Sequence, residues 1–533
     1  MSKDTFLKGA LILTIAGVIV KIIGSVNRIL LSRLLGGEGV GLYQMAYPIY
    51  LLALSVSSAG IPVAISIIVA EKLALSDYRG ANRVFRISLG VLAATGLLFT
   101  FLLYYGAGWL IEHHFVRDAR AYYAIAALAP AIFFVTVLSS YRGYFQGLQM
   151  MTPTAVSQIF EQLFRVITMI AFAYILLPRG LEYAAAGASF GAGPGAAAGL
   201  LVLLYFYWKH KPGFNHKMET QSQITQESSV SIISRIIKLA LPVSLANIML
   251  PVVSNIDLLI VPARLEVAGY TVEQATELFG YLTGMAVPLV NLATILTASL
   301  AASLVPAVSE AYTLGDKQRI YQRIATAMRI SNLITIPSFV GMWLLATPIS
   351  LMLYGTPNAG MPIAILAIGI FLLGIHQVTT GVLQGLGHTA IPVINMAASA
   401  VIKIVMSWIL TALPALGIMG AAWATVADFG VAALLNMFFV YRYVGFTLDI
   451  KDTFKAVVAS AVMGAVVLLS YDALMTYTLK NTLATLGSIA AGGIVFGMVL
   501  LLVGGVQAKD IDQLPRVGEK LTDILIKLRL LRR

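Results

Sequence analysis

Three cations lie inside the first long apolar stretch of the chain, in the segment KIIGSVNRILLSRLLG (21–36). Lys21 and Arg28 are seven residues apart, so in a helix they share one face, about 10 Å apart along the axis. A charged side chain at the centre of a bilayer costs roughly 2.5–3.5 kcal/mol on insertion scales, and such residues usually mark a functional site. The stripe predicts a water-filled site for an anionic group, with Asn27 beside it and Arg33 as an anchor at the outer surface. Snorkelling to an interface, or pairing with an acid, is the alternative for these cations.

A later apolar stretch carries an acid and a cation with the same spacing, Asp257 and Arg264. If Asp257 faces the cationic stripe, an ion pair made in one conformation and released in another would couple substrate binding to a structural change. A static structural ion pair is the alternative. Arg264 is expected near the outer end, as an anchor or a gate. Neutral polar residues in the spans are expected to contact a sugar or a peptide: Gln44, Asn255 and Asn291.

Further ionisable residues occur in other apolar stretches. Glu161 and Arg165 stand four residues apart with the acid first, a spacing that favours a self-neutralising pair on a helix. Lys403 has no acid four residues before it, so it either faces a cavity or pairs with Asp428. His376 is a candidate for protonation, and a hydrogen-bonded structural role is the alternative.

The composition identifies the class of protein. The chain has 533 residues, of which 59% are hydrophobic and 11% charged, whereas a soluble domain carries about 25% charged residues. It is therefore predicted to be an all-α polytopic membrane protein. The sequence contains no cysteine, which excludes disulfides and thiolate metal sites. It also has no phosphate-binding GK[ST] loop, HExxH motif or hydrolase elbow, so we expect a transporter, with no metal and no resident cofactor, rather than an enzyme.

The apolar stretches predict fourteen transmembrane helices, because a spanning helix needs about 20 apolar residues. The predicted spans are 7–35, 42–71, 84–111, 121–148, 154–178, 184–208, 233–262, 277–309, 324–353, 361–386, 391–414, 418–444, 454–477 and 482–505. The glycine-rich segment GGEGVG (36–41) follows a span and predicts a turn.

The loop charges predict the orientation. With both termini in the cytoplasm, most of the 36 lysines and arginines fall on the inner side. The net charge of +12 then reflects topology, not nucleic-acid binding. Glu71 and Glu310 end their spans beside inner cations, which predicts helix-end salt bridges. The polar segment 209–231 predicts a cytoplasmic linker, and 507–533 predicts a basic amphipathic tail on the inner leaflet.

The two halves of the chain resemble each other. FQGLQMMTP (145–153) matches LQGLGHTAIP (383–392), and LSDYRGANRVFRISLG (75–90) matches LGDKQRIYQRIATAMRIS (314–331). Each half therefore contributes six spans in the same order. We expect an N-lobe at 1–208 and a C-lobe at 232–445, related by a pseudo-two-fold axis along the membrane normal, around a central cavity. The region 446–506 adds two C-terminal helices.

This plan resembles the multidrug/oligosaccharidyl-lipid/polysaccharide (MOP) exporter superfamily. The opening segment 6–50 and the motifs GLY (41–43), AGIPVAIS (59–66) and LQGLGH (383–388) are similar to its polysaccharide-transport branch, closest to the sporulation and lipid II flippase members of Gram-positive bacteria. The resemblance implies alternating-access movement of an undecaprenyl-pyrophosphate-linked saccharide, foremost the peptidoglycan precursor lipid II, across the bacterial plasma membrane. It also implies roles in cell-wall synthesis, cell shape or sporulation.

Several alternatives stay open at this stage. One is a cation-coupled multidrug exporter of the same superfamily, although such a site would be dominated by buried acids, and the first span carries none. Another is a flippase for a teichoic acid or exopolysaccharide unit. The energy source is membrane potential or a coupling ion, Na⁺ or H⁺. We expect a monomer in the lipid bilayer that associates with cell-wall synthesis proteins.

Overall fold

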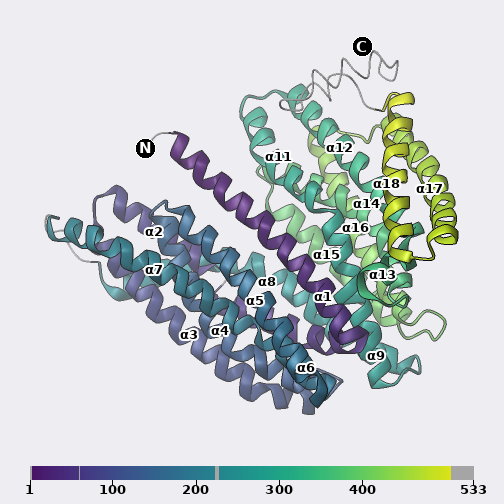
Figure 1. Ribbon diagram of the computed structural model, residues 1–533. Coiled ribbons are helices and arrows are strands. Elements are labelled where there is room, and N and C mark those ends of the chain that lie inside the picture. The colour runs from purple at the N-terminus through teal and green to yellow at the C-terminus, as the bar shows by residue number, and fades with distance from the viewer. Residues whose placement is uncertain (1–2, 59, 222–226, 506–533) are drawn as a thin grey trace. The chain divides into compact units, whose positions relative to one another are not determined.

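The computed structural model describes residues 3–58, 60–221 and 227–505, and over these residues every regular element is helical (Figure 1). The predicted tail at 507–533 and the middle of the predicted linker, 222–226, lie outside the described residues. The elements are α1 (Lys3–Ser58), α2 (Ile61–Ala74), α3 (Tyr78–Glu112), α4 (Ala121–Gly147), α5 (Met151–Leu176), η1 (Leu177–Arg179), α6 (Leu181–Phe190), α7 (Ala192–Glu219), α8 (Ser229–Val267), α9 (Val272–Phe279), η2 (Gly280–Ala286), α10 (Val287–Ala293), α11 (Ile295–Thr313), α12 (Lys317–Leu344), α13 (Ala346–Tyr354), α14 (Gly360–Gly385), α15 (Ala390–Leu410), α16 (Ile418–Val444), α17 (Ile450–Thr478) and α18 (Asn481–Leu502).

The helices confirm a multi-pass membrane protein. Within the described part of the chain, 12 helical segments are long and apolar enough to cross a membrane, or 13 if the bent pair α12–α13 forms one span. The first segment, Ile15–Ala74, has 60 residues, well beyond the roughly 20 that one crossing requires. At Gly36 the backbone leaves the helical region, with φ 66° and ψ −171°. The segment 36–41 was predicted to form a turn, but Gly36 is its only residue with a non-helical backbone, and the other five residues are helical.

Two predicted spans are not single straight helices, because proline interrupts each of them. The stretch 277–309 is divided among α9, the π-helical segment η2, α10 and α11. Pro288 cannot donate a hydrogen bond to the carbonyl of Gly284, which accounts for the irregular winding there. The stretch 324–353 bends by 80° between α12 and α13, where Pro348 blocks continuation of α12 beyond Leu344.

The sixth predicted span, 184–208, lies within a single membrane-length helical segment, Leu181–Glu219. This segment has a one-residue break at Gly191 between α6 and α7, where a Cβ would lie 2.6 Å from the backbone nitrogen of Met169 in α5. Helix α7 continues to Glu219, so the first half of the predicted linker is helical. The polar residues 209–219 therefore extend a span instead of forming a loop.

The chain divides into two compact units between Gly280 and Tyr281. In the first unit, α4 packs against α2, α3 and α7, and Figure 1 shows α3, α4 and α7 running side by side. Their shared core includes Ile65, Phe85, Leu138 and Phe145. Helix α8, which follows the predicted linker, packs against α1 and α2 and belongs to the first unit. The division into an N-lobe and a C-lobe at the linker stays a prediction.

The second unit is built around α14, which packs against α11, α12 and α16. Its core includes Val308, Ile324, Val378 and Leu383. Helices α17 and α18 lie side by side (Figure 1) and contact α12 and α13, respectively.

The internal repeat appears as the same helix packing in each unit. Gly147, in the first copy of the QGL motif, lies so close to α2 that a Cβ would be 2.7 Å from Val69. Gly385, in the second copy, approaches α11 equally closely, with 2.8 Å to Val308. Because only glycine permits this approach, the matched motif is explained by packing.

The second pair of matched motifs forms equivalent helix starts. Asp77 caps α3 by accepting a hydrogen bond from the amide of Gly80, and Asp316 caps α12 by accepting one from the amide of Arg319. Each cap follows a residue with positive φ, Ser76 at 58° and Gly315 at 70°. The shared pattern of turn and cap satisfies the free amides at a helix start.

Candidate functional site

A group of charged side chains joins α4 to α5 inside the first unit. Glu161 accepts hydrogen bonds from Arg142 at 2.8 Å and from Arg165 at 2.9 Å. The three side chains are between 14% and 18% exposed. Arg142 also contacts the hydroxyl of Ser157 through two of its nitrogens, at 3.1 Å each. The predicted pair of Glu161 and Arg165 is therefore confirmed, but a second arginine shares its acid.

Not every polar atom of this group is satisfied. Arg165 Nε and the hydroxyl of Tyr50 are buried and have no hydrogen-bond partner of good geometry among the described residues, although the two side chains lie beside each other. A buried donor without a partner costs about 1–3 kcal/mol. Buried groups of this kind are usually satisfied by water or by a ligand.

Tyrosines of α1 line the same region. Tyr43 stacks on Tyr47 with ring centroids 5.5 Å apart, and Tyr47 lies 5.9 Å from Tyr50. Both Arg28 and Arg165 lie within electrostatic range of the Tyr43 hydroxyl. Tyr43 therefore lies within electrostatic range of one arginine of the predicted stripe and of one arginine on α5.

The predicted stripe lies where α1 packs against α5. Asn27 is buried and donates to the sulfur of Met169 at 2.9 Å. Arg28 is half-buried, and Lys21 is exposed. Lys21 and Arg28 form no ion pair with any described residue. Neither cation is neutralised within the described part of the unit, which is consistent with the predicted anion site.

We refer to Arg28, Arg142, Glu161 and Arg165 as the cationic cluster. Arg142 and Arg165 share the carboxylate of Glu161, and Arg28 lies within electrostatic range of the Tyr43 hydroxyl, as Arg165 does. With three guanidinium groups and one carboxylate, these side chains carry an excess of positive charge within the membrane-spanning helices. Arginine can bind the oxygens of a phosphate with two parallel N–H groups. In a low-dielectric environment such contacts are stronger than in water. The cluster is therefore suited to a phosphate or pyrophosphate.

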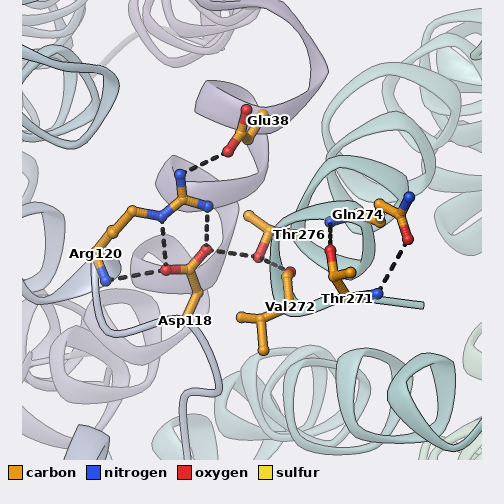
Figure 2. Close-up of polar contacts among 7 residues, drawn as sticks. All are labelled: Glu38, Asp118, Arg120, Thr271, Val272, Gln274 and Thr276. Carbon is orange, nitrogen blue, oxygen red and sulfur yellow. Dashed lines mark hydrogen bonds and ion pairs between the residues drawn. The ribbon is translucent and has the colours of Figure 1, made fainter. Parts of the chain in front are cut away.

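A second polar network is centred on the loop between α3 and α4 of the same unit (Figure 2). Arg120 donates to Asp118 at 2.7 Å and to Glu38 of α1 at 2.6 Å. Thr276 of α9 donates to Asp118 at 2.9 Å. The hydrogen bonds from Arg120 to Asp118 and then to Glu38 raise the pKa of Arg120 above its usual range. The network ties α9 and α1 to the same loop.

Close backbone packing accompanies this network. A Cβ at Gly41 would lie 2.0 Å from the carbonyl oxygen of Thr276, and one at Gly280 would lie 2.1 Å from that of Gly37. The glycines of the GGEGVG segment therefore allow α1 to contact the C-terminal end of α9, rather than forming a phosphate-binding loop.

The remaining predicted residues of the first unit lie on α1 and α8. Asn255 donates to the carbonyls of Pro48 and Pro251, at 2.8 Å each, and so links α8 to α1. Gln44 is buried, Asp257 and Arg264 are half-buried, and Arg33 is exposed. Asp257 lies on a helix that packs against α1, but its role as a switch stays a prediction.

Other predicted residues belong to the second unit. Lys403 is buried, and Asp428 accepts a hydrogen bond from Ser399 at 2.6 Å. His376 lies 3.5 Å from the hydroxyl of Thr380, and Asn291 is exposed. The two predicted helix-end salt bridges are confirmed: Glu71 pairs with Arg235, and Glu310 pairs with Arg319 at 3.6 Å. No group of acids and histidines that could hold a metal occurs in the described residues.

Sequence reasoning missed Arg142, the α1 tyrosines and the Asp118–Arg120 network. Arg142 could have been found, because it is an arginine inside a predicted span. The α1 tyrosines could not have been recognised from the sequence, because a row of aromatic side chains on a membrane helix usually packs against neighbouring helices. The network depends on the α3–α4 loop meeting α9, which no spacing in the sequence reveals.

Comparisons with known proteins agree with this fold. The sequence profile of the polysaccharide biosynthesis protein family matches residues 6–312, and that of the MatE family matches residues 242–409. Stage V sporulation protein B of Bacillus subtilis (strain 168) is 31% identical over 97% of this chain and 99% of its own length. Lipid II flippase MurJ of the same organism is 28% identical over 86% of this chain and 87% of its own length.

Two solved structures share the fold. One is an inward-facing multidrug resistance MATE transporter of the MOP superfamily, with a TM-score of 0.67 and 17% identity over 80% of this chain and 94% of that one. The other is lipid II flippase MurJ in an inward closed conformation, with a TM-score of 0.66 and 18% identity over 92% of this chain and 98% of that one. The chain belongs to the polysaccharide biosynthesis protein family.

Proposed function

We propose that this protein is a flippase that moves an undecaprenyl-pyrophosphate-linked saccharide, foremost lipid II, from the inner to the outer leaflet of the bacterial plasma membrane. The observation that carries the proposal is the cationic cluster, which contains three arginines and one glutamate inside the membrane-spanning helices, with Arg142 and Arg165 both bound to Glu161. The name of one relative, a lipid II flippase, supports the same substrate class.

The chemistry of the cluster matches the proposed substrate. A pyrophosphate carries at least two negative charges and offers several oxygens to guanidinium groups. The hydroxyls of Tyr43, Tyr47 and Tyr50 lie close to the arginines and can bond to phosphate or sugar. A teichoic acid or exopolysaccharide unit on the same lipid carrier offers the same phosphates. The cluster therefore supports the lipid-linked substrate class, and lipid II is the member of that class that we propose.

A cation-coupled multidrug exporter is the second candidate, favoured by the MatE match at residues 242–409. Such a protein would bind cationic drugs at a site with an excess of acids. The cationic cluster has the opposite charge balance, which favours the lipid-linked anion.

Transport is proposed to follow the plan that the repeat implies. The chain would cross the membrane fourteen times with both termini in the cytoplasm, and two six-helix lobes would alternate access to Lys21, Arg28, Asp257 and Arg264. Membrane potential acting on a cationic site contributes ~2.3 kcal/mol per charge per 100 mV. Na⁺ or H⁺ coupling through Asp257 or His376 is the alternative. The proposed protein is a monomer that associates with cell-wall synthesis proteins.

The decisive experiment is complementation of a bacterial strain depleted of its lipid II flippase. The wild-type protein is expected to restore growth and to relieve lipid II accumulation on the inner membrane face. Arg28→Ala should insert normally but fail to restore growth, whereas the control Arg33→Ala, at a predicted anchor, should behave as wild type. Normal growth with Arg28→Ala would overturn the site, and failure of the wild type would overturn lipid II as the substrate.

A further inference from the structure

A cavity of about 510 Å³ lies in the first unit, apart from the cationic cluster. It is formed by the end of α2, the start of α3, the end of α4 and the later part of α7. All four of these helix ends are predicted to be on the inner side of the membrane. The cavity therefore lies at the depth of the inner lipid head groups, and its size is within the range of about 300–1,000 Å³ typical of ligand sites.

The interior of the cavity is aromatic. Phe214 of α7 lies 5.7 Å from Tyr78 and 6.1 Å from Tyr144, and Tyr144 lies 6.2 Å from Tyr207, all between ring centroids. Tyr144 is only 3% exposed. Three of these four rings carry a hydroxyl, so the wall can contact both acyl carbons and ester oxygens, as interfacial tyrosines do.

The mouth of the cavity is cationic. Arg86, Lys211 and Lys217 line it and are exposed, and none of them forms an ion pair with a described residue. Lys211 lies 6.0 Å from the ring centroid of Tyr207, and Lys217 lies 5.5 Å from that of Tyr78. The rings therefore hold the two ammonium groups over the cavity. Among the described residues that line it, none is acidic.

Contacts between distant parts of the chain fix this arrangement. Arg79 of α3 donates to the carbonyl of Met218 at 2.9 Å, and its amide donates to Gln221 at 3.0 Å. Gln221 in turn donates to Asp77 at 3.1 Å. These hydrogen bonds hold the end of α7 against the start of α3. The walls of the cavity are therefore fixed relative to each other.

We propose that this cavity binds the phosphate head group of an anionic glycerophospholipid of the inner leaflet. The cations at the mouth contact the phosphate, the tyrosine hydroxyls contact the glycerol esters, and the aromatic wall holds the start of an acyl chain. Basic pockets on the cytoplasmic side of transmembrane helices recognise lipids in this way. The site is separate from the substrate site and does not depend on the proposed transport activity.

The experiment is lipid binding to the full-length protein, purified and delipidated in a non-ionic detergent. Native mass spectrometry measures retained phosphatidylglycerol against phosphatidylcholine with the same acyl chains. We expect wild type to retain phosphatidylglycerol at least tenfold better, and Lys211→Gln/Lys217→Gln to lose most of that preference. Inorganic phosphate at millimolar concentration should not compete.

A matched control tests whether lipid binding depends on the position of the lysines at the cavity or only on the number of positive charges. Lys209→Gln/Lys238→Gln removes two exposed cations near the same interface, and neither lines the cavity. Lys209 even makes an equivalent contact, 6.0 Å from the ring of Tyr205. The control should keep the wild-type preference. An equal loss in the control, an unchanged preference in the cavity variant, or displacement by inorganic phosphate would each overturn the lipid site.

Discussion

Arg142 Nη2 lies 2.8 Å from Glu161 Oε2, and this contact joins α4 to α5 among membrane-spanning helices. The same carboxylate binds Arg165 on its own helix. Removing one partner of a buried ion pair costs more than the pair contributes, because the other charge is left without compensation. Glu161 therefore holds two arginines in place and leaves the cationic cluster with excess positive charge for a ligand.

Substitution of Glu161 is predicted to destabilise the first unit. Glu161→Gln leaves Arg142 and Arg165 without a counter-charge, and we expect a loss of about 3 kcal/mol in the free energy of unfolding. Thermal unfolding in detergent measures this loss. Glu161→Gln/Arg165→Gln should be less destabilised than the sum of the two single variants, because the double variant removes both charges of one pair. Strictly additive losses would show that the two side chains do not interact.

The glycines of the repeated motif are predicted to be equivalent. Gly147→Ala and Gly385→Ala should each destabilise the protein by roughly 1–3 kcal/mol, because the new methyl group overlaps a valine on the neighbouring helix. Gly90→Ala is the control, since a Cβ there meets nothing within 4 Å. It should be neutral or slightly stabilising, as alanine favours helix. Thermal unfolding in the same detergent compares the three. If Gly385→Ala were harmless, the packing of the two units would not be equivalent.

The network around Arg120 is predicted to hold α9 in place. Arg120→Gln removes the hydrogen bonds to Asp118 and Glu38, and hydrogen exchange should rise in residues 271–279, since Thr276 depends on Asp118. The expected loss of stability is about 1–2 kcal/mol, because the site is partly exposed. Arg117→Gln, whose ion pair with Glu266 measures 3.7 Å, should change exchange little. Equal exchange in the two variants would refute the link.

A pH-dependent contribution is predicted at the start of α8. The hydroxyl of Ser231 donates to Glu227, and together with Lys72, at 3.1 Å, it lowers the pKa of this carboxyl. A lowered pKa stabilises the folded state above the ordinary glutamate pKa of about 4.3, and the contribution is lost as the pH falls through the lowered value. Wild type should be more stable than Glu227→Gln by up to about 1 kcal/mol at pH 7. Thermal unfolding from pH 7 to 3 should show the difference vanish; a constant difference would contradict the ionic origin.

Much of the fold could be predicted from the sequence. Apolar runs of membrane length fixed the class of protein, because each backbone polar group in a bilayer must be satisfied within its own helix. The matched segments 145–153 with 383–392, and 75–90 with 314–331, predicted equivalent elements, and the structure explains them by glycine packing and aspartate caps. The breaks at Pro288 and Pro348 were missed because hydropathy does not register a proline in an apolar run.

The site was only partly within reach of the sequence. Residue type and spacing alone determined that charges lie in the membrane-spanning helices and that Glu161 can pair with Arg165. Only the tertiary structure decided that Arg142 shares that acid, that Arg28 and Arg165 both lie within electrostatic range of Tyr43, and that Thr276 binds Asp118. The physical reason is that spacing along one helix fixes neighbours within that helix, whereas the rotation and depth of two packed helices depend on side chains far apart in the chain.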